Sequence, residues 1–278
     1  MEKYDLETEG AHLSVYDGNL LITFDRPRYA LSTAIYGGGF QHIKYALNRQ
    51  LMEFYPSEKD FPGGSVEAYL GLCAEKCGAA PGESSVLLTS ADVNYYAHKI
   101  IRAGSLLIET VATGGVVETA CRASSAPLYR EEKGVFGPVG TINLMVMMNG
   151  KLPDGIMARA LITLTEGKTA ALEDLGIADV NNGKPATGTS TDGITFITDP
   201  EGPLYTDAGT FSELGASLAR AAYESVIECI RIYGYTWNIS PLLVTPSAID
   251  IEPLKARYKE RNRIRNREMR KQKQSIKE

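Results

Sequence analysis

Residues Ile142–Met148 form the longest strongly apolar run in the chain, with Asn143 as the polar exception. A run of this length is far too short to cross a bilayer as a helix. The continuous apolar character from Thr141 to Met148 instead predicts a strand that is buried on both faces. The fold must therefore cover this strand on both sides.

The N-terminal region predicts a different kind of pairing. Two short apolar runs, His12–Tyr16 and Leu20–Phe24, flank Asp17-Gly18-Asn19, which is a hairpin signal. An antiparallel start argues against a purely parallel, doubly wound sheet. We therefore expect an α/β (α+β) fold, with a mixed sheet, an antiparallel N-terminal hairpin and helices packed on it, in a single layered domain.

Turn and capping residues divide the rest of the chain into further elements. Tyr29–Ile35 leads into a glycine cluster. The predicted strands are Ser84–Ser90, Leu106–Ala112 and Ile194–Thr198. The predicted helices are Gln41–Gln50, Ser65–Cys77, Ala91–Ile101, Asp154–Leu175 and a last one capped by Thr210 or Ser212 that reaches Tyr233.

The charge of the chain is unevenly distributed. The 278 residues carry a net charge of −5, yet the segment Lys255–Glu278 is strongly basic. The remaining acidic body argues against a face for duplex DNA. We expect a catalytic domain over residues 1–250 and a basic helix or tail over 251–278. The tail is interpreted as a solvated surface helix or frayed end, with binding to an acidic partner or RNA as the alternative.

Nothing in the sequence indicates export or metal binding. Met1–Gly10 has no apolar run, so it reads as neither a signal nor a transit peptide, and we expect a cytoplasmic protein with no membrane association. Cys73, Cys77, Cys121 and Cys229 are expected to be reduced thiols. The cysteines and the three histidines lack metal-ligand spacing, so we predict no metal and no cofactor.

Lys168 occupies an unusual position. On a helical wheel it falls near the centre of the apolar stripe of the predicted helix Asp154–Leu175. Burial of an unpaired ammonium is costly, so Lys168 requires a carboxylate partner or a polar cavity. It can be an electrophilic or substrate-anchoring group, or a paired lysine that ties the helix to a strand end. Gly167 weakens the prediction of an unbroken helix.

Two glycine-containing segments offer backbone groups to a ligand. In Thr187–Asp192, hydroxyl residues and glycine precede a strand, so this turn can present N–H and hydroxyl groups to an amide oxygen, although such residues are also ordinary in turns. Gly37, Gly38 and Gly39 allow close backbone approach but lack the spacing of a dinucleotide or phosphate loop.

Several segments, in this order, resemble the adenosylcobinamide amidohydrolase family. They cover roughly Leu31 to Val226 and comprise Leu31–Gly39, Leu88–Asp92, Gly140–Asn143, Thr165–Leu172, Ala186–Asp192 and Ala208–Gly215. The resemblance implies hydrolysis of the amide that joins aminopropanol to the corrin ring, giving adenosylcobyric acid, in corrinoid salvage or remodelling. A corrinoid would be the substrate rather than a resident cofactor. The chain could also form a homo-oligomer.

The resemblance suggests catalytic and substrate-binding roles for the residues in these segments, which we state as hypotheses. Glu166 or Asp192 activates water, and Lys168 with the turn Thr187–Thr189 stabilises the oxyanion. Asn143, Asp92 and the glycines Gly37–Gly39 position the substrate. A covalent route through Thr187 or Thr189 lacks an obvious histidine base.

The chain also departs from the family pattern. Gly167 replaces an alanine, Ser190 replaces a glycine, and the segment Gly115–Ala120, which contains Glu118, differs from Ser-Asn-Ala. Phe211 stands where the family often has histidine. Two alternatives follow: a non-catalytic corrinoid-binding relative, or an amidohydrolase that acts on another secondary amide.

Overall fold

The computed structural model describes residues 3–53, 55–116, 119–126 and 141–236. The chain divides into two compact units, Met1–Cys229 and Ile230–Glu278, and the description below concerns the first. Gly140, Glu118 and the basic segment 251–278 lie outside the described residues. The strands are β1 (Lys3–Asp5), β2 (Ala11–Tyr16), β3 (Asn19–Ser32), β4 (Gly39–Gln50), β5 (Ser84–Thr89), β6 (Ala97–Ala103), β7 (Leu106–Gly114), β8 (Ile142–Met148) and β9 (Gly193–Thr198). The helices are η1 (Glu58–Asp60), α1 (Val66–Lys76), α2 (Asp154–Asp174) and α3 (Glu213–Thr236), the last of which crosses the boundary between the units.

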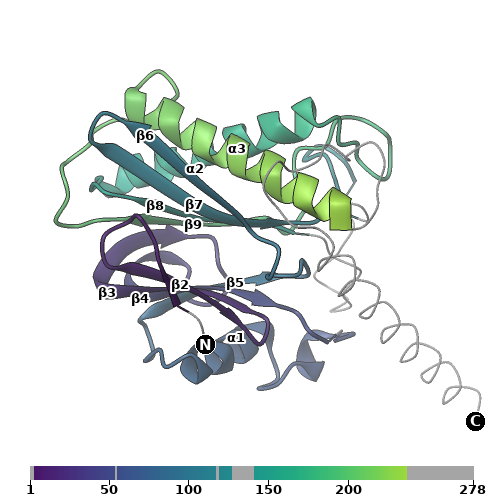
Figure 1. The fold of residues 1–278 in the computed structure, drawn as a ribbon. Coiled ribbons are helices and arrows are strands. Elements are labelled where there is room, and N and C mark those ends of the chain that lie inside the picture. Colours follow the sequence, from purple (N-terminus) through teal and green to yellow (C-terminus); the bar gives the residue numbers. More distant parts are fainter. Residues whose placement is uncertain (1–2, 54, 117–118, 127–140, 237–278) are drawn as a thin grey trace, which may run out of the picture. The chain divides into compact units, whose positions relative to one another are not determined.

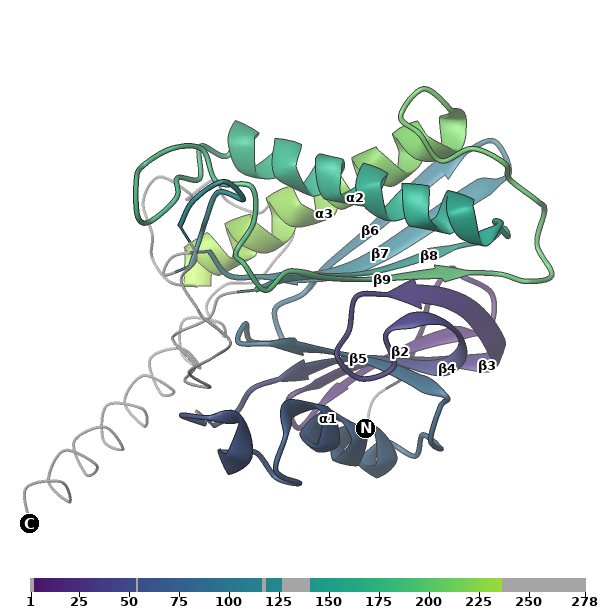
Figure 2. The same cartoon turned by 180° about the vertical axis from the view of Figure 1, so that it is seen from behind.

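The strands of the described residues form one mixed sheet that curls into two layers. Its main path is β1-β2-β3-β9-β8-β7-β6, and β4 pairs with β3 and with β5. The β4–β5 and β8–β9 pairs are parallel. In Figures 1 and 2, α2 and α3 cover the layer of β6–β9, and α1 covers the layer of β3–β5 from the other side. The prediction of a mixed sheet with packed helices is confirmed.

Strand β3 belongs to both layers. Its first half, Asn19–Phe24, pairs with β2, and its last residues, Tyr29–Ser32, pair with β9. The register against β4 shifts between Thr23 and Arg28, where the strand bends. The predicted hairpin precedes this bend, and Asp17 and Gly18 form its two-residue turn with positive φ angles of 47° and 73°.

Apolar side chains fill the space between the layers and beneath α1. The inner cluster joins residues from both layers, among them Leu20, Ile22, Ile43, Val111, Met145 and Ile197. A second cluster seats α1 on the outer face of β3–β5 through Leu70, Leu47 and Val86. The strand predicted from the apolar run is confirmed, because every residue of β8 is buried.

Two predicted helices are wrong. Gln41–Gln50 lies in β4, and the helix predicted over Ala91–Ile101 is replaced by a turn followed by β6. In β4, the local helical pattern yields to pairing on both edges, antiparallel with β3 and parallel with β5. Long-range pairing of this kind overrides intrinsic propensity.

Two of the remaining helices begin at the expected capping serines. Ser65 caps α1 by accepting from Ala68 N at 3.0 Å, and Ser212 accepts from Gly215 N at 3.0 Å at the start of α3. Pro153, rather than Asp154, occupies the N-cap position of α2. No helix within the described ranges is long and apolar enough to cross a membrane.

Candidate active site

Lys168 and Asp192 form a largely buried ion pair. Helix α2 points Lys168 at the turn that precedes β9, and the two side chains are only 7% and 14% exposed. The Lys168 ammonium donates to Asp192 Oδ2 and, at 2.9 Å, to the carbonyl oxygen of Thr187. The carboxylate partner that burial of Lys168 requires is therefore supplied by the turn.

The Asp192 carboxylate connects three segments of the chain. Besides Lys168, it accepts from the backbone N–H of Thr189 at 3.2 Å, from the Thr189 hydroxyl and from Ile142 N at 3.1 Å. Ile142 is the first residue of β8. The start of β8, the turn before β9 and the C-terminal half of α2 thus meet at one carboxylate.

Backbone conformation in the turn explains its composition. A β-carbon on Gly188 would lie 2.4 Å from Asp192 Oδ2 and 2.8 Å from Lys168 Nζ, so a larger residue would have to displace the ion pair. Ser190 has a positive φ of 69°, a left-handed conformation that glycine adopts without strain.

The first three N–H groups of the turn already have acceptors. Thr187 N and Gly188 N donate to the carbonyl oxygen of Cys121 at 2.9 Å and 3.2 Å, and Thr189 N donates to Asp192. The Thr187 hydroxyl accepts from Ala123 N at 2.9 Å. The N–H groups of Thr187, Gly188 and Thr189 therefore have acceptors within the chain.

Asn143 belongs to a buried polar chain next to the ion pair. Its Nδ2 donates to Asn48 Oδ1 at 2.8 Å and to the Leu88 carbonyl at 2.9 Å, and Asn48 donates in turn to Thr113. Among the described residues, Asn143 Oδ1 has no hydrogen-bond partner. A β-carbon on Gly193, the residue after Asp192, would lie 2.8 Å from this oxygen. Asn143 therefore lies close to the turn.

The glycine cluster follows the end of β3 that pairs with the start of β9. Gly37, Gly38 and Gly39 connect β3 to β4, and a β-carbon on Gly37 would lie 2.0 Å from the Ser84 carbonyl oxygen. Thr33 precedes the cluster and accepts from Ile194 N at 2.9 Å through its hydroxyl. The glycines thus come from the strand end that pairs with the start of β9.

Two predicted site residues make no described contact with the ion pair, so their catalytic and substrate-binding roles stay predictions. Glu166 is exposed on α2, since two residues turn a helix by about 200° from the face of Lys168. Asp92 follows β5, and its side chain accepts from the backbone and side-chain nitrogens of Asn94 at 3.1 Å and 2.7 Å. The described contacts connect neither carboxylate to Lys168.

Sequence reasoning missed two residues of the cluster. The Thr141 hydroxyl lies 2.9 Å from that of Thr191, beside the Asp192 carboxylate. Cys121 forms a backbone β-bridge with Gly188. Burial is the main cause that raises the pKa of the Cys121 thiol, and the negative charge of Asp192 is the second. Thr141 stands inside the quoted Gly140–Asn143 segment and could have been found there, whereas Cys121 carries no sequence signal.

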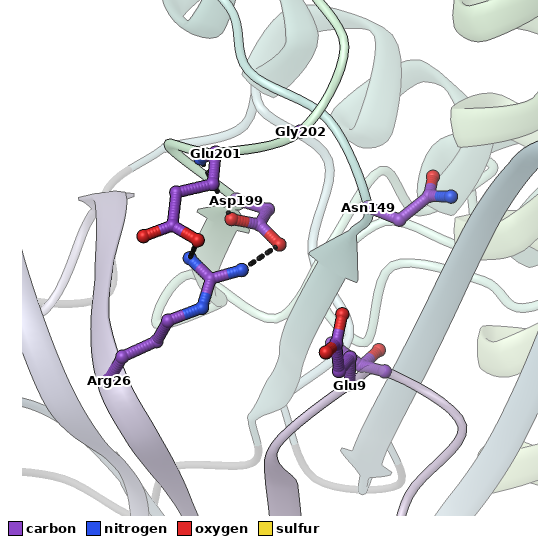
Figure 3. A pocket seen from close by; sticks show the side chains of 7 residues that line it. Glu9, Arg26, Asn149, Asp199, Glu201 and Gly202 are labelled. Atoms are coloured by element: carbon purple, nitrogen blue, oxygen red, sulfur yellow. Dashed lines mark hydrogen bonds and ion pairs between the residues drawn. The ribbon is translucent and has the colours of Figure 1, made fainter.

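A second charged group lies near the far end of β9. It lines a cavity of about 290 Å³, in which Arg26 donates to Asp199 at 2.7 Å and approaches Glu201 at 3.4 Å (Figure 3). Buried Arg28 also pairs with Asp199. Burial would raise the pKa of Asp199, but hydrogen bonds from the two arginines help to hold it below its ordinary value. Asp199 pairs with both arginines, which is typical of a carboxylate with a structural role.

Metal ligands do not gather in the described part of the chain. No group of three or more His, Cys, Asp or Glu side chains there could hold a metal ion. The four cysteines are free thiols.

Similarity to a known protein family identifies the chain as an amidohydrolase. It belongs to the adenosylcobinamide amidohydrolase family, whose model matches residues 4–236. An uncharacterized protein of Methanocaldococcus jannaschii is 29% identical over 226 residues, which cover 76% of this chain and 85% of that protein.

Solved structures show weaker likeness. The PH0078 protein of Pyrococcus horikoshii is 12% identical with a TM-score of 0.42, over 83% of this chain and 81% of that chain. A Burkholderia sp. β-aminopeptidase is 10% identical with a TM-score of 0.42, over 83% and 82%. An L-aminopeptidase D-Ala-esterase/amidase of Ochrobactrum anthropi is 11% identical with a TM-score of 0.38, over 91% of each chain.

Proposed function

We propose that the protein hydrolyses the amide between aminopropanol and the corrin ring of adenosylcobinamide. Water adds to the amide carbonyl, the C–N bond breaks, and the products are adenosylcobyric acid and 1-amino-2-propanol. The biological role would be corrinoid salvage or remodelling in the cytoplasm. Family membership supports the reaction class, and the corrinoid substrate is the finer part of the proposal.

The observation that carries the proposal is the incomplete hydrogen bonding of the buried Lys168 ammonium. An ammonium has three N–H donors, and two are used by Asp192 and by the Thr187 carbonyl. The third is uncommitted within the described residues. A preorganised cation with a free donor in a site of low exposure is suited to the oxyanion that forms when an amide is attacked.

Asp192 is the carboxylate best placed to accept a proton. Its Oδ1 accepts from Ile142 N, Thr189 N and the Thr189 hydroxyl, whereas Oδ2 holds Lys168 and only a shared contact from Thr189 N. Because the Thr189 N–H is shared equally with Oδ1, Oδ2 is the less saturated of the two oxygens and the one that a water molecule would contact. The proton taken from water would then pass to the leaving amine.

A covalent route is the less favoured mechanism. The Thr189 hydroxyl donates to Asp192 but is fully buried, and the Thr187 hydroxyl accepts from the backbone. Thr189→Val separates the routes: a nucleophile would be lost completely, whereas an orienting hydroxyl would leave measurable turnover.

The test is incubation of the purified full chain with adenosylcobinamide, followed by mass analysis. We expect adenosylcobyric acid and free 1-amino-2-propanol in equal amounts. Corrinoid binding without release of aminopropanol would identify a non-catalytic relative instead. Absence of corrinoid binding, with turnover of a simpler secondary amide, would identify an amidohydrolase of other specificity.

A further inference from the structure

A shallow groove lies at the opposite end of β9 from the Lys168–Asp192 pair. Asp192 directly precedes β9, whereas Thr198, its last residue, lines the groove. An extended strand of this length separates the two by about 20 Å. The groove, with a volume of about 370 Å³, is therefore separate from the candidate active site and has no part in the proposed hydrolysis.

One wall of the groove is aromatic. Tyr29 of β3 and His42 of β4 line it and are register partners, with ring centroids 4.9 Å apart and ring planes tilted by 41°. Phe40, beside the lining residues, stacks on Tyr29 at a centroid distance of 6.1 Å. Aromatic faces arranged in this way favour a further planar ring.

The other wall is aliphatic and comes from the segments after β8 and β9. It consists of Leu152, Pro153, Pro200 and Leu204. Leu204 is 58% exposed, and Phe40, which contacts Tyr29 but does not itself line the groove, is 43% exposed. Uncovered large apolar side chains in and beside one hollow are typical of an interaction site.

One exposed cation lines the groove. Lys151 lines it, is exposed, and forms no ion pair with any residue in the described ranges. The carboxylate of Asp154 accepts from the Tyr29 hydroxyl at 2.8 Å and keeps its negative charge, but Asp154 is not among the residues that line the groove. Burial and this hydrogen bond raise the pKa of Tyr29, so its phenol stays uncharged near neutral pH.

We propose that the groove binds a planar aromatic anion of about mononucleotide size. Its ring stacks on Tyr29 and His42 beneath Leu204, and its anionic group pairs with Lys151. A hollow of this volume falls at the lower end of the range for small-molecule sites. Stacking supplies affinity for any flat ring, and the single cation supplies preference for an anion.

The test is isothermal titration of the full chain with four probes: adenosine 5′-monophosphate, adenosine, inorganic phosphate and 2-naphthoate. We expect the monophosphate to bind about tenfold more tightly than adenosine, and phosphate alone not to bind measurably. Binding of 2-naphthoate as well would extend the ligand class from phosphates to carboxylates. Added salt should weaken the binding of the monophosphate and leave the binding of adenosine unchanged.

Exposed residues provide variants that should fold. His42→Ala and Lys151→Gln should each weaken the monophosphate about tenfold, whereas Lys59→Gln, an exposed lysine on η1, should not. Two results would overturn the proposal: no binding of either anionic probe at millimolar concentration, or equal binding by these three variants. A concentration-dependent dimer that Leu204→Ser dissociates would show that a second copy covers the groove, and would overturn it too.

Discussion

Gly167 of α2 lies against Ala219 of α3 so closely that a β-carbon on Gly167 would be 2.3 Å from the Ala219 carbonyl oxygen. The missing side chain therefore sets how near the two helices approach. Gly167 is also the neighbour of Lys168, so the crossing point helps to hold that lysine in place.

Gly167→Ala should lower the free energy of unfolding by about 1–3 kcal/mol, because the helices must separate to admit a methyl group. Urea denaturation measures the change. Gly155→Ala is the matched control, because Gly155 lies in the first turn of the same helix with open space around it. That variant should be about 0.5–1 kcal/mol more stable than wild type. A stabilised Gly167→Ala protein would contradict the close crossing.

Turnover should depend on the buried ion pair. Lys168→Ala and Asp192→Asn should each reduce kcat about 100-fold or more, because an oxyanion donor or a proton acceptor is lost. Glu166→Gln, on the exposed face of the same helix, should stay near wild type. Product formation under saturating substrate measures all three.

Loss of folding must be distinguished from loss of chemistry. Removing one member of a buried pair can cost about 3–5 kcal/mol, whereas replacing both by apolar residues is often neutral. The double variant Lys168→Met/Asp192→Leu should therefore regain thermal stability and remain inactive. An active double variant would show that the pair is only structural.

The left-handed Ser190 offers a stabilising substitution. Ser190→Gly should raise the free energy of unfolding by roughly 0.5–1 kcal/mol, because a non-glycine residue pays for positive φ. Ser190→Ala should not, since it keeps a β-carbon and loses the hydroxyl contact to the Thr189 carbonyl at 2.5 Å. Thermal melts compare the two, and a higher melting temperature for the alanine variant would exclude strain as the cause.

Acid should destabilise the fold through Glu109. Burial alone would raise its pKa, but hydrogen bonds from His98 and Thr8 outweigh burial and hold the pKa below its ordinary value of 4.5. The unfolded chain therefore takes up the proton first as pH falls. The stabilisation is present above about pH 4.5 and is lost as pH falls through the folded-state pKa.

Glu109→Gln should thus be less stable at pH 7, by about 1–3 kcal/mol, with a difference from wild type that shrinks in acid. Glu83→Gln, which removes only a partly exposed carboxylate 3.9 Å from Lys44, is the control and should show neither effect. Denaturation at pH 7 and pH 3.5 measures both, and a difference independent of pH would exclude the ionised Glu109.

Periodicity was sufficient for some of these features and not for others. It placed Lys168 on the buried stripe of α2, and the cost of a lone buried charge then required a partner. The identity of the carboxylate that pairs with Lys168 depends on the path of the turn before β9. The same periodicity places Glu166 on the opposite face, two residues away, although similarity to the family motif had grouped it with Lys168.

Pairing between distant segments was the information that the sequence lacked. Gln41–Gln50 has an acceptable helical pattern by itself, and only β3 and β5 on its two sides make it a strand. Gly167 likewise suggested a helix break, because its reason for being glycine lies in α3. Local rules describe a segment, and both cases were decided by a neighbour far along the chain.

The shared strand β3 has a mechanical consequence. Two stacked sheets that meet only through side chains can slide or part while each keeps its hydrogen bonds. Here one continuous backbone passes from the first layer into the second at the Thr23–Arg28 bend. Separation of the layers would have to break the ladder of β3 itself, so both layers should exchange their slowest amide protons in a single cooperative event.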